Sequence, residues 1–484
     1  MKRFWERNYL IVLVFFALTF FFLRPPTDPD LGWHLRYGQT IIEKFEIPRT
    51  DDFSYTMPGF EWADSYWLSE AVIYLGYKYF SFLGLSVFFA LIADAAFFLA
   101  LINREDWQKD FFRLRTVPII LTGILLLLPF VGIRPQTISL FFFSLLLYLW
   151  REGSKKWLPF LFLIWANFHA GFVLGLLVLW LFWFVDIIAI LRRTLLPPKE
   201  SPFLKKLPWP TIQILTTLAT LVNPYGLFLY RSILNDAASS EIKNGIIEWA
   251  APNFHSDLGA FFTLYALGLI ALLVLIRTRL KVEMTLMTLV FLLFGFSAVR
   301  NIPLLVILAT PLWYLLPIQM PWRLPSFYRY WGGFTFFGVA LYCLFVFGRS
   351  FASGAWSFYD TRGIGDYPQK AMEYLKANPP KGNLFNTYGW GGFVIWNLPE
   401  VKTFIDGRMC GWKRSGEPSL FSEYDSAVEL KTGWEDILKK YEVDWVLMES
   451  EAHLVQALKI RRDWVVTYED EKATILMRSD NVLE

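Results

Sequence analysis

The chain has 484 residues, of which 55% are hydrophobic and 19% aromatic, and its mean hydropathy is +0.38. A single soluble core cannot bury so many apolar side chains, so the composition predicts a polytopic membrane protein. The formal net charge is only +3, and the basic residues form short clusters, which argues against a nucleic-acid partner. Cys343 and Cys410 have no metal-ligand spacing, so we expect neither a disulfide framework nor a zinc site.

The N-terminus resembles a signal peptide at first sight. Lys2, Arg3 and Arg7 precede an apolar run from Tyr9 to Leu23, but Arg24-Pro25-Pro26 follows without a small-x-small cleavage site. We therefore predict an uncleaved first helix.

Apolar runs that reach or approach the length needed to cross a bilayer predict about eleven transmembrane helices. The predicted spans are Tyr9 to Leu23, Phe82 to Ile102, Val117 to Val131, Gln136 to Trp150, Trp157 to Phe168, Phe172 to Leu191, Pro210 to Val222, Leu258 to Ile276, Met284 to Val299, Ile302 to Leu316 and Trp331 to Phe347.

Lys and Arg cluster in every second gap between these runs, which predicts the sidedness of the chain. The basic gaps, including the N-terminus, are expected in the cytoplasm, and the protein in the plasma (inner) membrane. The other gaps are expected outside, and they hold the polar residues that are candidates for chemistry. These outer gaps are Arg24 to Leu68, Gly132 to Pro135, Asn167 to Gly171, Asn223 to Asp257, Arg300-Asn301 and everything after Arg349.

Two domains are predicted from the change of composition near residue 350. Residues 1–349 form a membrane domain with an outer loop at 24–68, and residues 350–484 form a small extracytoplasmic α/β domain. The predicted elements of the second domain are strands at Asn383 to Thr387, Val401 to Ile405 and Val443 to Glu449, helices at Trp434 to Tyr441 and Glu451 to Ile460, and a hairpin of Trp464 to Tyr468 with Thr474 to Arg478.

The first outer loop contains the leading catalytic candidates, Asp28 and Asp30, directly before an amphipathic, helix-like segment from Leu31 to Phe45. A solvated acidic loop beside an interfacial aromatic belt is the simpler interpretation of most of its side chains. Carboxylates in a semi-enclosed site can instead accept a proton from a nucleophile or bind a divalent cation. The sequence leaves Mg or Mn open as a cofactor of these two residues.

Two outer arginines, Arg134 and Arg300, are candidates for binding a lipid phosphate, because a phosphate leaving group needs cationic stabilisation. Snorkelling from a helix end explains them equally well. His34 and His169 are second-rank site candidates, although a structural hydrogen bond is the commoner fate of a lone histidine.

In the C-terminal part, Asp406 and Arg408 either meet an acceptor or pair with each other. The run from Asn386 to Gly392 has the form of a tight strand-to-helix turn, or of a backbone cradle for an anion.

Several short motifs resemble those of bacterial membrane glycosyltransferases of the GT-C superfamily. The resemblance covers nearly the whole chain. The motifs that carry it are Asp28-Pro29-Asp30-Leu31-Gly32-Trp33-His34-Leu35, Ile47-Pro48, Asp51 to Thr56, Trp62 to Glu70, Arg134-Pro135-Gln136, Asn167 to Gly171, Asn223 to Gly226, Glu248-Trp249, Arg300-Asn301 and Asp406-Gly407-Arg408.

This resemblance implies transfer of a sugar from a polyprenyl-phosphate-linked donor to an envelope acceptor, which is a glycan, a lipid or a protein. It also implies that a first-loop acid acts as base or metal ligand. The Asp-Pro-Asp pattern differs from the Asp-Glu pair of the mannosyltransferase branch, which leaves metal dependence open. A membrane transporter and a non-catalytic scaffold of an envelope-assembly complex are the alternatives, but the predicted spans hold few charges beyond Asp94 and Asp186, which disfavours a transporter.

Overall fold

The computed structural model describes residues 15, 19–102, 116–195, 210–278, 280–313, 315, 338, 341–342, 345 and 367–482. Most of the predicted first and last spans, Tyr9 to Leu23 and Trp331 to Phe347, and Cys343 lie outside these residues. The chain divides into two compact units. Unit 1 comprises Met1–Arg24, Val87–Gly226 and Glu248–Arg349, and unit 2 comprises Pro25–Ser86, Leu227–Ile247 and Ser350–Glu484.

The first outer loop groups with the C-terminal residues in unit 2. The assignment of residues 1–349 and 350–484 as membrane and extracytoplasmic domains stays a prediction.

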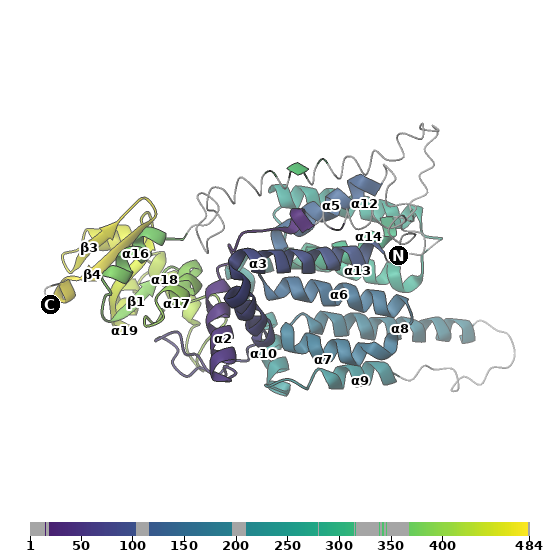
Figure 1. Ribbon diagram of the computed structural model, residues 1–484, viewed down its shortest axis with the longest axis horizontal. Coiled ribbons are helices and arrows are strands. Elements are labelled where there is room, and N and C mark those ends of the chain that lie inside the picture. Colours follow the sequence, from purple (N-terminus) through teal and green to yellow (C-terminus); the bar gives the residue numbers. More distant parts are fainter. Residues whose placement is uncertain are drawn as a thin grey trace. The chain divides into compact units, whose positions relative to one another are not determined.

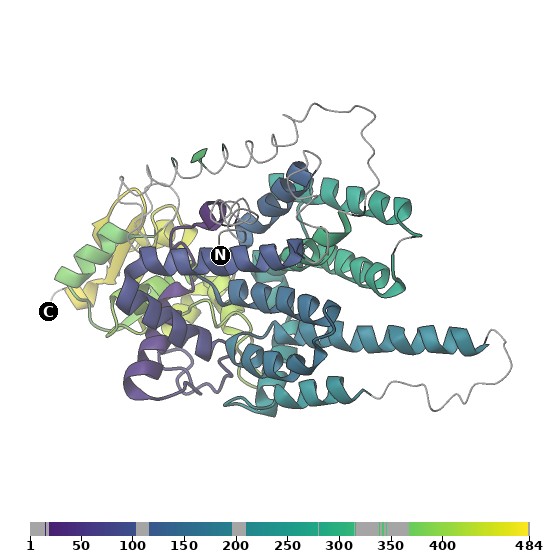
Figure 2. The same cartoon turned by 45° about the vertical axis from the view of Figure 1, so that its right-hand side comes forward.

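Unit 1 is built from helices. Figure 1 shows α6, α7, α8 and α9 side by side, and Figure 2 gives the same cartoon turned by 45°. Helix α14 of this unit contacts both α12 and α13. The elements are α5 (Thr116–Leu127), η1 (Leu128–Phe130), α6 (Pro135–Arg151), η2 (Lys155–Trp157), α7 (Leu158–Phe168), α8 (Phe172–Leu195), α9 (Thr211–Ala219), α12 (Asp257–Leu275), α13 (Val282–Ser297), η5 (Val299–Asn301) and α14 (Ile302–Trp313), with η4 (Ile247–Trp249) at a boundary between the units.

The helices of unit 1 follow the predicted apolar runs closely, because these runs begin and end at Pro, Gly, Asn or charged residues. Within the described residues, α3 (Trp67–Leu101) and α12 are long and apolar enough to cross a membrane, and several other apolar helices are shorter. The count of eleven spans therefore stays a prediction.

Helix α3 starts fifteen residues before the predicted span Phe82 to Ile102. Its first part carries Glu70 and Lys78, so a search for hydrophobic runs misses it. The backbone of Ser81 has φ 57° and ψ −174°, which breaks the helix at the point where the apolar run begins.

Unit 2 contains a four-stranded sheet in the order β1-β2-β4-β3, with β1 parallel to β2 and the other pairs antiparallel. Its strands are β1 (Asn383–Asn386), β2 (Val443–Glu449), β3 (Trp464–Glu469) and β4 (Ala473–Arg478). Its helices are α2 (Leu31–Lys44), the start of α3, α10 (Leu227–Ala238), α11 (Ser240–Gly245), α16 (Gln369–Ala377), α17 (Gly391–Asn397), α18 (Leu420–Val428), α19 (Trp434–Lys440), α20 (His453–Lys459) and α21 (Ser479–Val482), with the short turn η7 (Tyr388–Trp390) before α17.

Alternate residues of β2 enter two hydrophobic clusters on opposite faces of the sheet. Val446 and Met448 belong to one cluster, and Trp445 and Leu447 to the other. The first cluster also contains buried side chains of the first outer loop, such as Trp33. This loop is therefore part of the core of unit 2.

One sequence prediction in unit 2 is wrong. Val401 to Ile405 is not a strand of the sheet: Thr403, Phe404 and Ile405 are buried and Lys402 is exposed, and the segment takes part in an isolated bridge between Ser54 and Thr403. The outer gap from Asn223 to Asp257 contains the helices α10 and α11, which were not predicted. Both are short and mixed in polarity, which explains why hydropathy alone does not reveal them.

Candidate functional site

A small cavity in unit 1 brings together three residues that the sequence singled out. Arg134, His169 and Arg300 all line it, together with Glu248 and Ser139. Its volume is about 80 Å³. A single water molecule needs about 10–15 Å³ in this measure, so the cavity has room for a group of phosphate size.

Local backbone geometry places Arg134 at this cavity. The residue precedes Pro135, the first residue of α6, and proline disfavours helical geometry in the residue before it. Arg134 accordingly has φ −143° and ψ 140°. The Oγ1 of Thr137 donates a hydrogen bond to the carbonyl of Gly132 at 3.0 Å, which fixes the turn.

Arg134 also forms an ion pair across the cavity. Its Nη1 lies 2.7 Å from Oε1 of Glu248, with side-chain exposures of 22% and 37%. Glu248 belongs to η4. The following residue, Trp249, lies under the guanidinium of Arg300, and 4.2 Å separates the guanidinium carbon from the ring centroid. The backbone N–H of Val299 donates to the carbonyl of Ala250 at 2.9 Å, so the segments that carry Glu248 and Arg300 are held together.

His169 follows the last residue of α7 and is only 5% exposed. Its Nδ1 accepts the backbone N–H of Gly171 at 2.8 Å, which places the proton of the neutral ring on Nε2. Burial, reinforced by the Arg300 cation, lowers the pKa of His169 to about 3. The ring is therefore a neutral hydrogen-bond donor at physiological pH, and the two arginines and Glu248 leave the cavity with one net positive charge.

Gly171 is required by this close packing. A Cβ at that position would lie 2.2 Å from Oγ of Ser139 and 2.8 Å from Nδ1 of His169. Any larger residue would displace the ring that lines the cavity.

The two first-loop carboxylates lie in unit 2 at the start of α2, and both are partly exposed. Oδ1 of Asp28 accepts the backbone N–H of Asp30 at 2.8 Å, and Oδ1 of Asp30 accepts Nε1–H of Trp33 at 3.0 Å. The backbone of Gly407 packs directly against the Asp30 carboxylate, because a Cβ there would lie 1.8 Å from Oδ1.

The described residues contain no group of three or more His, Cys, Asp or Glu side chains placed to hold a metal ion. Magnesium requires near-octahedral coordination by oxygen ligands, which Asp28 and Asp30 alone do not supply. Asp28 and Asp30 therefore do not make up a magnesium site by themselves.

His34 is buried with Glu70, and its Nδ1 lies 3.0 Å from Oε1 of that residue. Asp64 is also fully buried, and this burial raises the pKa of Asp64 to about 6. Asp64 and Glu70 are buried carboxylates that were not predicted as site residues, because acidic side chains are usually solvated. The His34 side chain, paired with the buried Glu70, therefore lies in the interior of unit 2.

Asp406 and Arg408 pair with each other, which is one of the two alternatives left open by the sequence. Nε of Arg408 donates to Oδ1 of Asp406 at 2.7 Å, and Nη2 donates to Oδ2 at 2.6 Å and to Oδ1 of Asp51 at 2.8 Å. All three side chains are at most 1% exposed, so this network is part of the core that joins the first loop to the C-terminal residues.

The run from Asn386 to Gly392 contains the single turn η7 followed by α17. The backbone N–H of Trp390 donates to the carbonyl of Thr387 at 3.0 Å. This is the geometry of the strand-to-helix turn considered from the sequence.

A comparison with protein-family models and with curated protein sequences finds no match. Solved structures are similar to this chain over most of its length. The apo structure of ArnT from Cupriavidus metallidurans has a TM-score of 0.50 at 13% identity and covers 97% of both chains. The apo oligosaccharyltransferase of Archaeoglobus fulgidus has a TM-score of 0.51 at 11% identity and covers 92% of this chain and 70% of that one.

A third structure, the oligosaccharyltransferase AglB of Archaeoglobus fulgidus in complex with an inhibitory peptide and a dolichol-phosphate, has a TM-score of 0.52 at 11% identity, covering 93% and 70% of the two chains. At such low identities the similarity shows the fold alone. The GT-C-like fold predicted from the sequence motifs is confirmed. The apolar helices of the described residues fit a helical membrane protein.

Proposed function

We propose that this chain, with its GT-C-like fold, is an integral-membrane glycosyltransferase that transfers a sugar from a polyprenyl-phosphate-linked donor to an envelope acceptor on the outer side of the membrane. The observation that carries the proposal is the cavity of unit 1, where Arg134, Arg300 and a neutral His169 meet in a space of about 80 Å³. The solved structure that contains a dolichol-phosphate has a similar fold, which supports a lipid-phosphate donor.

The role proposed for the cavity is to bind the phosphate that leaves the sugar. Arg134 and Arg300 contribute positive charge, and the Nε2–H of His169 contributes a donor that does not titrate near neutral pH. Negative charge grows on the phosphate oxygen as the bond to the sugar breaks, so cations and donors placed there bind the transition state more tightly than the ground state.

The role proposed for Asp28 or Asp30 is that of a general base. The carboxylate takes the proton of the acceptor hydroxyl or amide, the acceptor atom forms a bond to the anomeric carbon, and the bond from that carbon to the phosphate oxygen breaks. The polyprenyl phosphate leaves with both electrons of that bond. Partial exposure leaves both carboxylates accessible to an acceptor.

Transfer from radiolabelled polyprenyl-phosphate sugars by the full chain in proteoliposomes tests the proposal. Replacing Arg134 or Arg300 by alanine should reduce kcat/KM by about ten- to a hundredfold, because hydrogen bonds to charged groups contribute about 1.5–3 kcal/mol. Arg277→Ala, at an exposed position of unit 1, is the matched control. Absence of transfer with every donor, or equal kcat/KM in all three variants, would reject the donor-phosphate cavity.

A further inference from the structure

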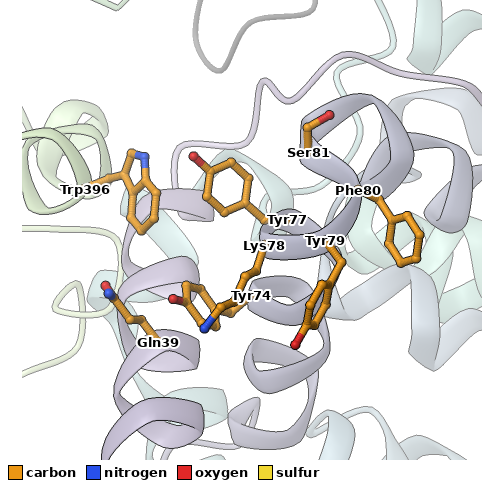
Figure 3. A pocket seen from close by; sticks show the side chains of 8 residues that line it. All are labelled: Gln39, Tyr74, Tyr77, Lys78, Tyr79, Phe80, Ser81 and Trp396. Atoms are coloured by element: carbon orange, nitrogen blue, oxygen red, sulfur yellow. The ribbon is translucent and has the colours of Figure 1, made fainter.

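Unit 2 contains an open cleft that the proposed transfer step does not use. It has a volume of about 730 Å³ and is lined by side chains of α2, α3 and α17. Figure 3 shows the rings of Trp396 and Tyr77 on one side of the space and Gln39, Tyr74 and Lys78 on the other. Binding sites for small molecules usually measure about 300–1,000 Å³, so the cleft is of ligand size.

The aromatic side of the cleft is rigidly held. The rings of Tyr77 and Trp396 meet edge to face, with centroids 5.3 Å apart. Arg36 lies 5.0 Å from the Trp396 ring centroid, and its Nη2 donates to the carbonyl of Trp396 at 2.9 Å. These contacts fix the orientation of the Trp396 ring, so binding against its accessible part costs little side-chain entropy.

The polar side is a network centred on Glu43. Its Oε1 lies 3.2 Å from Nζ of Lys78, its Oε2 accepts Nε2–H of Gln39 at 3.1 Å, and the hydroxyl of Tyr74 donates to the same carboxylate. The charges of Glu43 and Lys78 cancel, while the amide, hydroxyl and ammonium groups offer both donors and acceptors. Nη1 of Arg36 donates to Oε1 of Gln39 at 2.8 Å and Nη2 donates to backbone carbonyls, so both Nη groups are already engaged.

We propose that this cleft binds a neutral saccharide. A sugar ring has C–H faces that pack on aromatic rings and hydroxyl groups around its edge that exchange hydrogen bonds with mixed donors and acceptors, and the two sides of the cleft match these two surfaces. An acyl chain would remove water from Gln39 and Lys78, which line the cleft, without replacing their hydrogen bonds, and this is unfavourable.

The position of the cleft along α3 fits a ligand at the membrane surface. Tyr79 and Phe80 are each 70% exposed and precede the break at Ser81, after which the helix is apolar. Exposed aromatic side chains at the start of an apolar span are typical of the bilayer interface. Identifying the saccharide as the acceptor rests on the proposed function, but its binding does not.

Saturation-transfer NMR on the full chain, held in a detergent without a sugar head group, tests this assignment. The probes are cellobiose, maltose, chitobiose and mannobiose. We expect at least one to bind with a Kd of about 10 mM or below. Trp396→Ala and Tyr77→Ala should each raise that Kd about fivefold, in line with one lost aromatic contact, whereas Trp396→Phe should change it about twofold or less.

Trp157→Ala is the matched control, because Trp157 is 54% exposed in unit 1 and lies outside the cleft. Size-exclusion elution of each variant checks folding, and Tyr77→Ala carries the test if the Trp396 variants fail this check. No binding of any probe, equal Kd values for Trp396→Ala and Trp157→Ala, or tighter binding of glucose 1-phosphate than of every neutral probe would overturn the proposal. If the parent protein carries bound lipid that Trp396→Ala loses, the cleft is a lipid site and the proposal is overturned. None of these outcomes depends on sugar transfer, so the cleft and the transferase are tested separately.

Discussion

Arg134 and Glu248, which are 114 residues apart in the sequence, form an ion pair of 2.7 Å at the cavity that Arg300 also lines. Under the proposed function, the Glu248 carboxylate lies where the phosphate would bind to Arg134. Glu248 and the phosphate then compete for the same guanidinium, because both bind it through anionic oxygens.

Replacing Glu248 by glutamine should strengthen inhibition by free polyprenyl phosphate. Partly exposed ion pairs contribute at most about 1 kcal/mol, so the inhibition constant should fall by up to about fivefold. Glu152→Gln, at an exposed position, serves as the control. A higher inhibition constant in Glu248→Gln would mean that Glu248 orients Arg134 for the phosphate instead of competing with it.

His169 should make the protein less stable as the pH decreases. The pKa of this ring is lowered to about 3 in the folded state, whereas an unfolded histidine titrates near 6.5. Between these values the unfolded chain binds more protons, so the stabilisation is complete above about pH 6.5 and decreases by up to about 1.4 kcal/mol per pH unit on acidification.

The difference in unfolding midpoint between pH 7.5 and pH 5 should therefore be smaller in His169→Gln than in the parent. His255→Gln, which changes an exposed histidine, should retain the full difference. The ring stays neutral throughout this range, so the pH profile of kcat/KM should contain no ionisation from His169. Equal pH dependence of stability in all three proteins would contradict a buried neutral ring.

Much of the helical structure was predictable because apolar runs are bounded by helix-starting residues. Pro135 and Phe172, for example, begin α6 and α8 within one residue of the predicted starts. The first part of α3 was missed because its polar face packs inside the protein, and hydropathy cannot distinguish that face from a solvated one.

The candidate site was predictable only in part. Arg134, His169 and Arg300 were expected on one side of the membrane, and all three line one cavity. Glu248 lies in a predicted outer gap, but its ion pair with Arg134 was not predicted. That pairing depends on long-range contacts, such as the hydrogen bond between Val299 and Ala250, which leave no signal in the sequence. The carboxylates Asp28 and Asp30 stay predicted catalytic residues.

Arg408 should be essential for the stability of unit 2. Arg408→Met leaves Asp51 and Asp406 buried without their counterion, which typically costs about 3–5 kcal/mol and corresponds to a decrease in Tm of about 10 °C. Arg408→Lys should recover only part of this loss, because lysine cannot form the paired contacts of a guanidinium. The exposed Arg414→Met is the control. A thermal unfolding curve of Arg408→Met that overlays the control would refute this role.

The predicted sidedness can be tested with single cysteines at exposed positions. Cysteines introduced at Glu61 and Ser415 should react with a membrane-impermeant maleimide in intact cells, whereas one at Lys156 should react only after permeabilisation. Asp64 is unsuitable for this test because it is fully buried. If the cysteine at position 156 reacts in intact cells, and the cysteines at positions 61 and 415 do not, the predicted orientation is reversed.

The last prediction is that Asp28 or Asp30 acts as the general base of the transferase. Asparagine keeps the volume and the hydrogen-bond acceptor that the backbone N–H of Asp30 or the indole of Trp33 requires, so Asp→Asn should preserve the fold. It removes the group that takes the proton, and general-base catalysis contributes about 100- to 10,000-fold in rate.

A single-turnover assay with a polyprenyl-phosphate sugar measures this step without product release. Asp52→Asn, an exposed carboxylate of the same loop, is the control and should keep the parent rate. A loss of about 100-fold or more in one variant, with an unchanged elution profile, would identify the base. If both Asp28→Asn and Asp30→Asn stay within about threefold of the parent, the base is not in this loop, since so small a change is far below the general-base range.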